Sequence, residues 1–193
     1  MVYTLHDCER HSIWDNSIPP ALRIKPGEEV ELKIVEASDG QISLSSTTKD
    51  IENLDSSRAN PVTGPIFIEG AKPGDALKVT IQDLKPSGWG WTANIPDFGL
   101  LQEDFPDAAL ELWKYDRSLN EAAMFGDFAK IELNPFIGTL GVAPAENGEH
   151  GTIPPRHVGG NLDLKDCRKA SEIIFPVECE GALFSAGDTH AAQ

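Results

Sequence analysis

Cysteine and basic side chains are scarce in this chain of 193 residues. Its three cysteines, Cys8, Cys167 and Cys179, form no CxxC pair, so neither a disulfide framework nor a thiolate zinc site is predicted. Only 16 Lys and Arg oppose 31 Asp and Glu, which gives a net charge of -15. Because nucleic acids and anionic membranes bind basic surfaces, this charge disfavours both as partners and favours a neutral or cationic small ligand.

Long apolar runs are also missing. No stretch approaches the roughly 18 apolar residues that a membrane span needs. The first residues, MVYTLHDCERHSIWD, lack the basic start and the apolar core of a signal peptide. We therefore expect a soluble cytoplasmic protein that does not bind a membrane.

Glycine and proline are abundant, with 17 Gly and 14 Pro. They separate short β-branched runs, a pattern typical of β sandwiches and barrels. The predicted strands span residues 29–35, 41–45, 66–69, 76–84, 129–133 and 172–177. Helices are predicted only within 107–115 and around 51–54. The sequence thus predicts a single, mainly β unit over residues 1–193, with sandwich- or barrel-like sheets, few short helices and an internal boundary near 87–97.

Two similar turns precede predicted strands. The segments Lys25-Pro26-Gly27-Glu28 and Lys72-Pro73-Gly74-Asp75 each combine a proline with a following glycine. Proline presets φ at the first central position of a turn, and glycine supplies the positive φ at the second. We interpret both turns as architectural rather than functional.

Residues suited to chemistry gather in the segment HGTIPPRHVGGNLD and in the final GDTHAAQ. The pair Gly159 and Gly160 lets a backbone approach a ligand closely, and short polar side chains follow it. Asp163, Asp188 and His190 together would suit zinc or another borderline divalent metal with an open coordination position. The alternative is that these residues only form turns, as Asn and Asp beside glycine often do.

Two further segments carry candidate groups. Near the amino terminus, His11, Trp14 and Asp15 place a titratable ring, an aromatic platform and a carboxylate within a few residues. The alternative there is a capped turn with Trp14 as a core anchor. Glu69 closes the predicted strand 66–69, where a carboxylate can be held rigidly as a general base, although strand-end glutamates are normally solvated.

Four motifs, in order along nearly the whole chain, resemble those of the acetamidase/formamidase family, whose members hydrolyse short amides to ammonia and the carboxylate. The motifs are HSIWDNSIPPALRIKPGEEV, NPVTGPIFIEGAKPGDALKVTIQDL, GTIPPRHVGGNLD and EGALFSAGDTHAAQ. The resemblance implies a mainly β fold with few helices, an oligomer, and a metal in or near the site.

The resemblance also implies roles for individual residues. The GGNLD loop corresponds to the family's Gly-Gly-Asn-x-Asp loop and gives Asn161 and Asp163, and GDTH corresponds to its Gly-Asp-x-His segment and gives Asp188 and His190. The expected metal ligands are Asp163, Asp188 and His190. His11 and Glu69 are the expected catalytic residues, and the expected substrate-binding residues are Trp14, Asp15, Gly159, Gly160 and Asn161.

The chain departs from the family pattern in two places. Asn60 begins NPVTGP where family members commonly have His, which removes one potential ligand or proton carrier. The family also continues beyond the final Gln with Gly-Asp-Gly-Glu and a substantial further part. The chain is then a fragment, one product of a nicked chain, or a natural short version. We expect an incomplete part of a longer amidase or a nicked product, with a carboxyl-terminal polypeptide as its partner.

The predicted mechanism is attack on the amide carbonyl by a metal-activated water, with Glu69 or the downstream Glu as general base and the amides near Gly159 and Gly160 as oxyanion donors. A nucleophilic Cys167 or Cys179 is the alternative mechanism, although neither has a nearby His in the sequence. The alternative function is a non-catalytic β module that binds a small ligand or a partner. The sequence does not distinguish formamide from acetamide.

Overall fold

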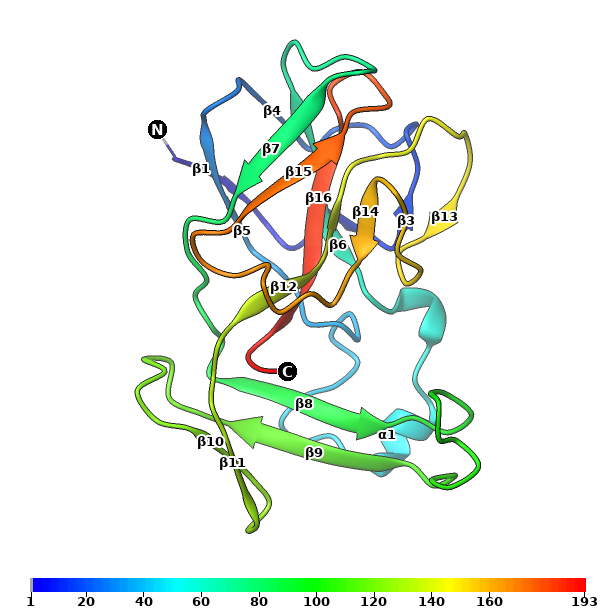
Figure 1. Cartoon of the computed structure of the whole chain (residues 1–193). Helices are drawn as coiled ribbons and strands as arrows, with labels where there is room; N and C mark the ends of the chain where they lie inside the picture. Colours follow the sequence, from blue (N-terminus) through cyan, green and yellow to red (C-terminus); the bar gives the residue numbers. More distant parts are fainter. Residues whose placement is uncertain (1) are drawn as a thin grey trace.

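Short strands are the main regular secondary structure in the computed structural model, which describes residues 2–193 (Figure 1). One six-stranded sheet has the order β14-β12-β16-β6-β2, with β4 also paired to β6. Its strands are β2 (Arg10–His11), β4 (Leu22–Ile24), β6 (Val62–Ile68), β12 (Phe136–Gly141), β14 (Gly159–Asn161) and β16 (Phe184–His190). The β4–β6 pair is parallel and the other pairs of this sheet are antiparallel. Strands from both ends of the sequence therefore meet around β6 and β16.

Within residues 2–193, the other strands form two-stranded sheets. These pairs are β1 (Val2–Leu5) with β5 (Glu29–Leu32), β3 (Ile13–Trp14) with β13 (His150–Gly151), β7 (Ala76–Thr80) with β15 (Glu172–Pro176), β8 (Trp89–Asn94) with β9 (Ala109–Lys114), and β10 (Ala123–Phe125) with β11 (Ala129–Ile131). The helical segments are α1 (Thr48–Glu52) and the 3₁₀ turn η1 (Ser56–Arg58). None of the helices in this described part of the chain has the length and apolar character needed to cross a membrane.

The hydrophobic core lies where the six-stranded sheet packs against β7, β15 and the amino-terminal strands. Leu140 and Val142 at the end of β12 are fully buried, and Phe175 from β15 and Ile81 after β7 belong to the same cluster. Along β7 the exposed Lys78 and Thr80 alternate with half-buried neighbours, as the sequence pattern predicts for a strand with one wet face. Burial of this apolar surface is the main force that holds the small sheets together.

The predicted mainly β fold is confirmed, and observed strands overlie five of the predicted ranges: β5, β6, β7, β11 and β15. The predicted helix around 51–54 is present but begins earlier, at Thr48, because Thr47 and Asp50 form a capping box in which the Thr47 amide donates to the Asp50 carboxylate at 2.7 Å. Each predicted turn is also present: the Glu28 amide donates to the Lys25 carbonyl, and the Asp75 amide to the Lys72 carbonyl.

Two predicted elements are wrong. The helix predicted within 107–115 is instead strand β9, which pairs along its whole length with β8. A short amphipathic segment takes the conformation that its tertiary partner dictates, and here Trp113 of β9 also stacks on Phe125. The strand predicted at 41–45 is not formed. The Ile42 amide donates to Ser38 Oγ at 2.9 Å. This local hydrogen bond to a side chain takes the place of the backbone hydrogen bond that Ile42 would make to a neighbouring strand.

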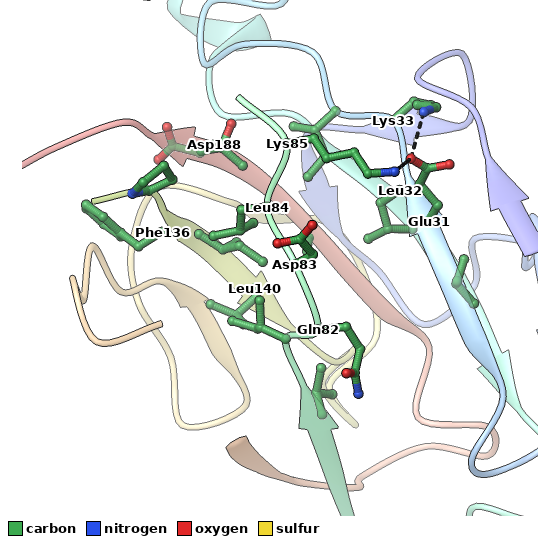
Figure 2. A pocket seen from close by; sticks show the side chains of 18 of the residues that line it. Glu31, Leu32, Lys33, Gln82, Asp83, Leu84, Lys85, Phe136, Leu140 and Asp188 are labelled. Atoms are coloured by element: carbon green, nitrogen blue, oxygen red, sulfur yellow. Dashed lines mark hydrogen bonds and ion pairs between the residues drawn. The ribbon is translucent and has the colours of Figure 1, made fainter. Parts of the chain in front are cut away.

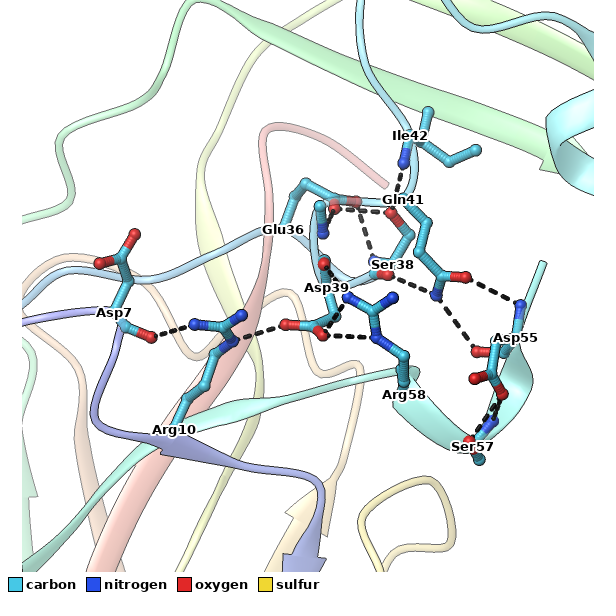
Figure 3. Close-up of polar contacts among 11 residues, drawn as sticks. Asp7, Arg10, Glu36, Ser38, Asp39, Gln41, Ile42, Asp55, Ser57 and Arg58 are labelled. Carbon is cyan, nitrogen blue, oxygen red and sulfur yellow. Dashed lines mark hydrogen bonds and ion pairs between the residues drawn. The ribbon is translucent and has the colours of Figure 1, made fainter.

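The loop 36–41 that contains this bond joins several distant parts of the chain (Figure 3). Asp39 accepts from Arg10 Nε at 2.5 Å and from Arg58 Nε at 2.8 Å. Glu36 accepts from the amides of Ser38 and Gly40, and also from the indole of Trp91 on β8. The loop thereby ties the β8–β9 pair and the 3₁₀ turn to the six-stranded sheet.

A second polar contact joins β5 to the segment that follows β7 (Figure 2). Lys33 and Lys85 each place Nζ 2.9 Å from Glu31 Oε1. The hydrogen bond from Lys85, together with Lys33, lowers the pKa of Glu31 to about 2. Because this pKa is depressed in the folded protein, the contact stabilises the fold above the ordinary pKa of Glu31, and this contribution is lost as the pH falls toward about 2.

We predict that Lys85→Met raises the pKa of Glu31 from about 2 toward its ordinary 4.5, with Lys33 preventing a full return. A carboxyl-detected NMR titration of the variant measures this change. Lys78→Met, which removes the separate Lys78–Glu172 pair, is the matched control and should leave the Glu31 pKa unchanged. An unaltered Glu31 pKa in Lys85→Met would contradict the assigned contact.

Candidate active site

Asp163, Asp188 and His190 come together at the edge of the six-stranded sheet. Each offers one ligand atom, and these atoms lie within 4.8 Å of one another. His190 Nε2 lies 3.4 Å from Asp163 Oδ1 and 3.5 Å from Asp188 Oδ1. Among residues 2–193 this is the group of His, Cys, Asp and Glu that could hold a metal ion. The structure thus brings together the three side chains that the sequence indicated as metal ligands.

Strand order explains how residues 25 positions apart meet. Strand β12 pairs with β14 on one side and with β16 on the other, so that Thr139 lies opposite both Asn161 and Gly187. Asp163 follows β14, and Asp188 lies within β16. Both aspartates have a left-handed backbone, with φ of 47° and 46°, which is uncommon outside glycine. This backbone strain is typical of functional sites, where the surrounding structure holds it in place.

The space for the cluster comes from Gly138 in β12. A Cβ at this position would lie 2.6 Å from His190 Nε2 and 2.9 Å from Asp163 Oδ1. No side chain fits at such distances, so the glycine is a requirement of the cluster. Sequence reasoning missed Gly138 because the buried run FIGTLG of β12 was not recognised as a strand, although its unbroken apolar and small character is typical of a central one.

A small polar network supports the buried carboxylate of Asp188. The amide nitrogen of Asn161 faces three oxygens: Thr139 Oγ1 at 2.9 Å, Asp163 Oδ1 at 3.0 Å and Asp188 Oδ2 at 3.1 Å. The hydroxyl of Thr139 donates to Asp188 Oδ2 at 3.4 Å, and Asn60 Nδ2 donates to the same oxygen at 3.3 Å. Asn60, the position at which the sequence departs from the family pattern, therefore belongs to the site as a donor to Asp188.

Two more residues that the sequence did not indicate contact the cluster. The ring of Phe136 stacks on His190, with ring centroids 4.6 Å apart and an angle of 15° between the planes. Gln193 Nε2 donates to the backbone carbonyl of Asp163 at 3.0 Å. The stacked ring fixes the plane of the imidazole, and the Gln193 contact joins the end of the chain to the loop that carries Asp163.

The charges in the cluster shift its pKa values. Burial, and then the negative charge of Asp188, raise the pKa of Asp163. Burial alone would lower the pKa of His190, but the carboxylates of Asp188 and Asp163 outweigh it and raise this pKa. His190 Nε2 is nevertheless buried and has no hydrogen-bond partner among residues 2–193. A buried nitrogen 3.4 and 3.5 Å from two carboxylate oxygens is stabilised either by a proton on the ring or by a cation held between the three groups.

The cluster fits a divalent metal. Ligands about 2.0–2.1 Å from one tetrahedral ion are about 3.3 Å apart, close to the distances from His190 Nε2 to the two carboxylate oxygens. Two carboxylate oxygens and one imidazole nitrogen are a donor set that suits zinc and other borderline metals. Three protein ligands also leave one position open, as in catalytic zinc sites.

A wide cleft of about 2240 Å³ opens beside the cluster, and Asp188 and His190 line it together with Phe136 and Leu140 (Figure 2). Pockets for small ligands usually measure about 300–1,000 Å³. The cleft therefore gives a small molecule access to the cluster and has room for more than a small molecule.

Glu69, the predicted general base, does not lie at the cluster. It is exposed and follows the end of β6, whereas the cluster lies near Val62 at the opposite end, where β6 pairs with Gly187. Seven residues of extended chain separate Val62 from Glu69, which corresponds to roughly 20 Å. The sequence placed Glu69 at a strand end correctly but gave no information about which end faces the site.

The amino-terminal motif divides between two sheets: His11 on β2 pairs with Val62 of β6, whereas Trp14 belongs to β3, which pairs with β13. Trp14 is 2% exposed and packs as a core anchor, and Asp15 Oδ1 accepts from the Ser17 amide at 2.8 Å, a bond that lowers the pKa of Asp15. His11 is largely buried, and its ring bonds Ile13 O and Ser185 Oγ. None of the three is part of the metal-ligand group. The substrate-binding role of Trp14 and Asp15 stays a prediction: Asp15 caps a turn, and the buried Nε1 of Trp14 has no hydrogen-bond partner among residues 2–193.

The glycine pair before Asn161 serves strand pairing. A Cβ at Gly159 would lie 2.5 Å from the Leu140 carbonyl, and one at Gly160 would lie 3.2 Å from the Pro154 carbonyl. The Gly159 amide donates to Arg156 O at 3.1 Å and so already has an acceptor. Both glycines have φ above 100°. Gly159 allows β14 to lie close to β12, where Asn161 is opposite Thr139, and Gly160 leaves room for the backbone of residues 154–156.

The thiols lack the surroundings of a nucleophile. Burial raises the pKa of both Cys167 and Cys179, whereas a nucleophilic cysteine needs a lowered pKa. Cys167 is 1% exposed. The thiol of Cys179 faces the Ala143 carbonyl at 3.5 Å. Their hydrogen bonds among the described residues include none to a histidine.

We predict that Gly138→Ala disrupts the cluster, because the added methyl group would overlap His190 Nε2 and Asp163 Oδ1. The expected result is at least about a tenfold loss of zinc affinity with the circular dichroism spectrum retained. Gly151→Ala is the matched control, since a Cβ there meets nothing within 4 Å. Isothermal titration with zinc compares the two, and equal affinities would contradict the proposed role of Gly138.

Known proteins are similar to this chain in sequence and in fold. The sequence model of the acetamidase/formamidase family matches residues 3–149 and 146–193. An acetamidase of Mycolicibacterium smegmatis is 30% identical over 243 residues, which cover 95% of this chain and 60% of that protein. A formamidase of Methylophilus methylotrophus is 26% identical over 239 residues, which cover 97% and 59%.

Solved structures of the same family have a similar fold. The acetamidase of Bacillus halodurans has a TM-score of 0.90 at 29% identity, covering 98% of this chain and 62% of that one. The acetamidase of Yersinia enterocolitica has a TM-score of 0.84 at 29% identity, covering 100% and 61%. The chain spans about three fifths of the length of these relatives. With the family model matching almost the entire sequence, this chain belongs to the acetamidase/formamidase family.

Proposed function

We propose that this chain carries the metal-binding part of an amidohydrolase that cleaves short aliphatic amides, such as formamide or acetamide, to ammonia and the carboxylate. The observation that carries the proposal is the group Asp163, Asp188 and His190, with the unpartnered His190 Nε2 between two carboxylates. Membership of the acetamidase/formamidase family supports the substrate class.

Asp163, Asp188 and His190 would hold the ion, and zinc is the metal that we propose for this donor set. A divalent metal supplies Lewis acidity, which polarises an amide carbonyl and makes water a nucleophile near neutral pH. The protein residues around the cluster orient its ligands. Asn161, Thr139 and Asn60 direct the Asp188 carboxylate, and Phe136 holds the plane of His190.

The reaction also needs a general base that later protonates the departing ammonia. The sequence allows two, Glu69 or a carboxylate beyond this segment. The exposed position of Glu69 at the far end of β6 favours the second. We therefore propose that a further polypeptide, as a continuation or as a separate chain, covers the wide cleft and supplies this group. The size of the cleft and the greater length of the relatives support this proposal.

Substitution of the proposed ligands tests whether these residues bind a metal ion. We predict that Asp188→Asn and His190→Gln each lower bound zinc, measured by elemental analysis, from about one ion per chain to near zero. His157→Gln is the matched control, because His157 pairs with Glu178 at an exposed site and should leave zinc content unchanged. Zinc retained in both ligand variants would show that the metal lies elsewhere or is adventitious.

Alkylation separates the metal mechanism from the thiol mechanism. Iodoacetamide should leave ammonia release from formamide unchanged, since Cys167 is buried and burial raises the pKa of both candidate thiols. A chelator should abolish the same activity, and zinc should restore it. Loss of activity on alkylation, with chelator resistance, would instead support a nucleophilic cysteine.

Activity is best measured on protein purified from its natural host, with intact mass spectrometry on the same sample. A co-purifying polypeptide, together with formamide or acetamide hydrolysis, supports a site shared with a further polypeptide. Zinc binding without hydrolysis by any purified form would overturn the amidase proposal and support a non-catalytic ligand-binding module. Native mass spectrometry of the sample also tests the homo-oligomer that the family resemblance implies.

A further inference from the structure

A partly buried hydrogen bond joins His11 on β2 to Ser185 on β16, 174 residues away in the sequence. His11 Nε2 lies 2.9 Å from Ser185 Oγ. The other ring nitrogen, Nδ1, lies 2.5 Å from the Ile13 carbonyl. The ring therefore uses both nitrogens, one on its own segment and one on the strand that carries Asp188 and His190.

The Ile13 carbonyl decides the direction of these bonds. A carbonyl can only accept, so Nδ1 carries the proton and donates to Ile13 O. In a neutral ring Nε2 is then an acceptor, and the Ser185 hydroxyl donates to it. Burial, which lowers the pKa of His11, favours this neutral form. His11 thus offers Ser185 a fixed acceptor.

Strand β6 lies between β2 and β16, and Ser185 reaches across it at Gly64. A Cβ at Gly64 would lie 2.2 Å from Ser185 Oγ and 2.8 Å from Ser185 Cβ. The serine side chain therefore occupies the space that a side chain at position 64 would take. Glycine at this position is what allows the bond between non-adjacent strands.

Ser185 also lies opposite an irregularity in β6. Phe184 pairs with Ile66 and Ala186 pairs with Thr63, so two residues of β6, Gly64 and Pro65, face the single Ser185 of β16. Such a bulge disrupts the pairing locally, and bulges are common next to active sites. Asp188 and His190 lie three and five residues beyond Ser185 along β16.

We infer that His11 is a positioning residue, which acts through Ser185 to hold β16 in register against the bulge of β6 and thereby fixes the placement of Asp188 and His190. For the metal role of these two residues the inference rests on the proposed function. Ser185 is 0% exposed, so its hydroxyl does not face a substrate, although the Ser–His contact resembles that of a nucleophile and its base. The role thus differs from that of the catalytic residue expected for His11 from the sequence.

Two substitutions of His11 separate loss of the bond to Ser185 from loss of the imidazole ring itself. In His11→Gln the carboxamide reaches about as far as Nε2 and keeps a partner for Ser185, whereas the shorter side chain of His11→Asn keeps only the bond to Ile13 O. Ser185→Ala removes the bond from the other side. Hydrogen exchange of the metal-free protein compares the amides of residues 186–190 with those of the β7–β15 pair, which report on global stability.

The expected result is exchange about tenfold faster at residues 186–190 in His11→Asn and Ser185→Ala, with the β7–β15 amides unchanged and His11→Gln close to the native rate. Titration with Co²⁺ alone, followed by visible absorption, should show about tenfold weaker binding in the same two variants.

The inference would be overturned if the amides of residues 186–190 exchanged at equal rates in His11→Gln and His11→Asn. A native exchange rate at these amides in Ser185→Ala would also overturn it. Equally faster exchange at residues 186–190 and at the β7–β15 amides would overturn the inference as well, because the bond between His11 and Ser185 would then contribute only to global stability. If the native protein binds no Co²⁺, the metal proposal fails, while the exchange result still decides the role of His11.

Discussion

The buried carboxylate of Asp188 is the constraint on which the site depends. It is 6% exposed, and a carboxylate removed from water costs several kcal/mol unless hydrogen bonds and opposite charge compensate. Asn161, Thr139 and Asn60 all direct donors toward Asp188 Oδ2, and His190 lies beside Oδ1. These groups come from four separate parts of the chain, so the site forms only when the strands of the sheet come together.

Small residues make this convergence possible. Gly138 leaves the space in which the cluster sits, and Gly64 lets Ser185 reach His11 across an intervening strand. Gly159 allows β14 to approach β12 closely. Each of these glycines replaces a side chain that would collide with a neighbouring strand. The polar groups of the site are therefore placed by close backbone packing as much as by their own hydrogen bonds.

Prediction from sequence succeeded where a pattern is local. The alternation along β7 and the two Lys-Pro-Gly turns were recognisable because a strand face and a tight turn depend on nearby residues. Prediction failed for β9, where pairing with β8 decides between helix and strand. It also failed for residues 41–45, where the Ser38 hydroxyl accepts the hydrogen bond of the Ile42 amide and no strand forms. Strand β12 was missed because its fully buried run has no alternation.

The sequence by itself determined the mainly β class and singled out Asp163, Asp188 and His190 as a candidate group, because short motifs carry both kinds of information. Only the tertiary structure decided that Phe136, Gly138, Thr139 and Asn60 support this group, that Glu69 lies at the far end of β6, and that His11 contacts Ser185. These relations depend on which strands are neighbours. Strand order is set by packing between segments that are distant in the sequence, and a local pattern does not record it.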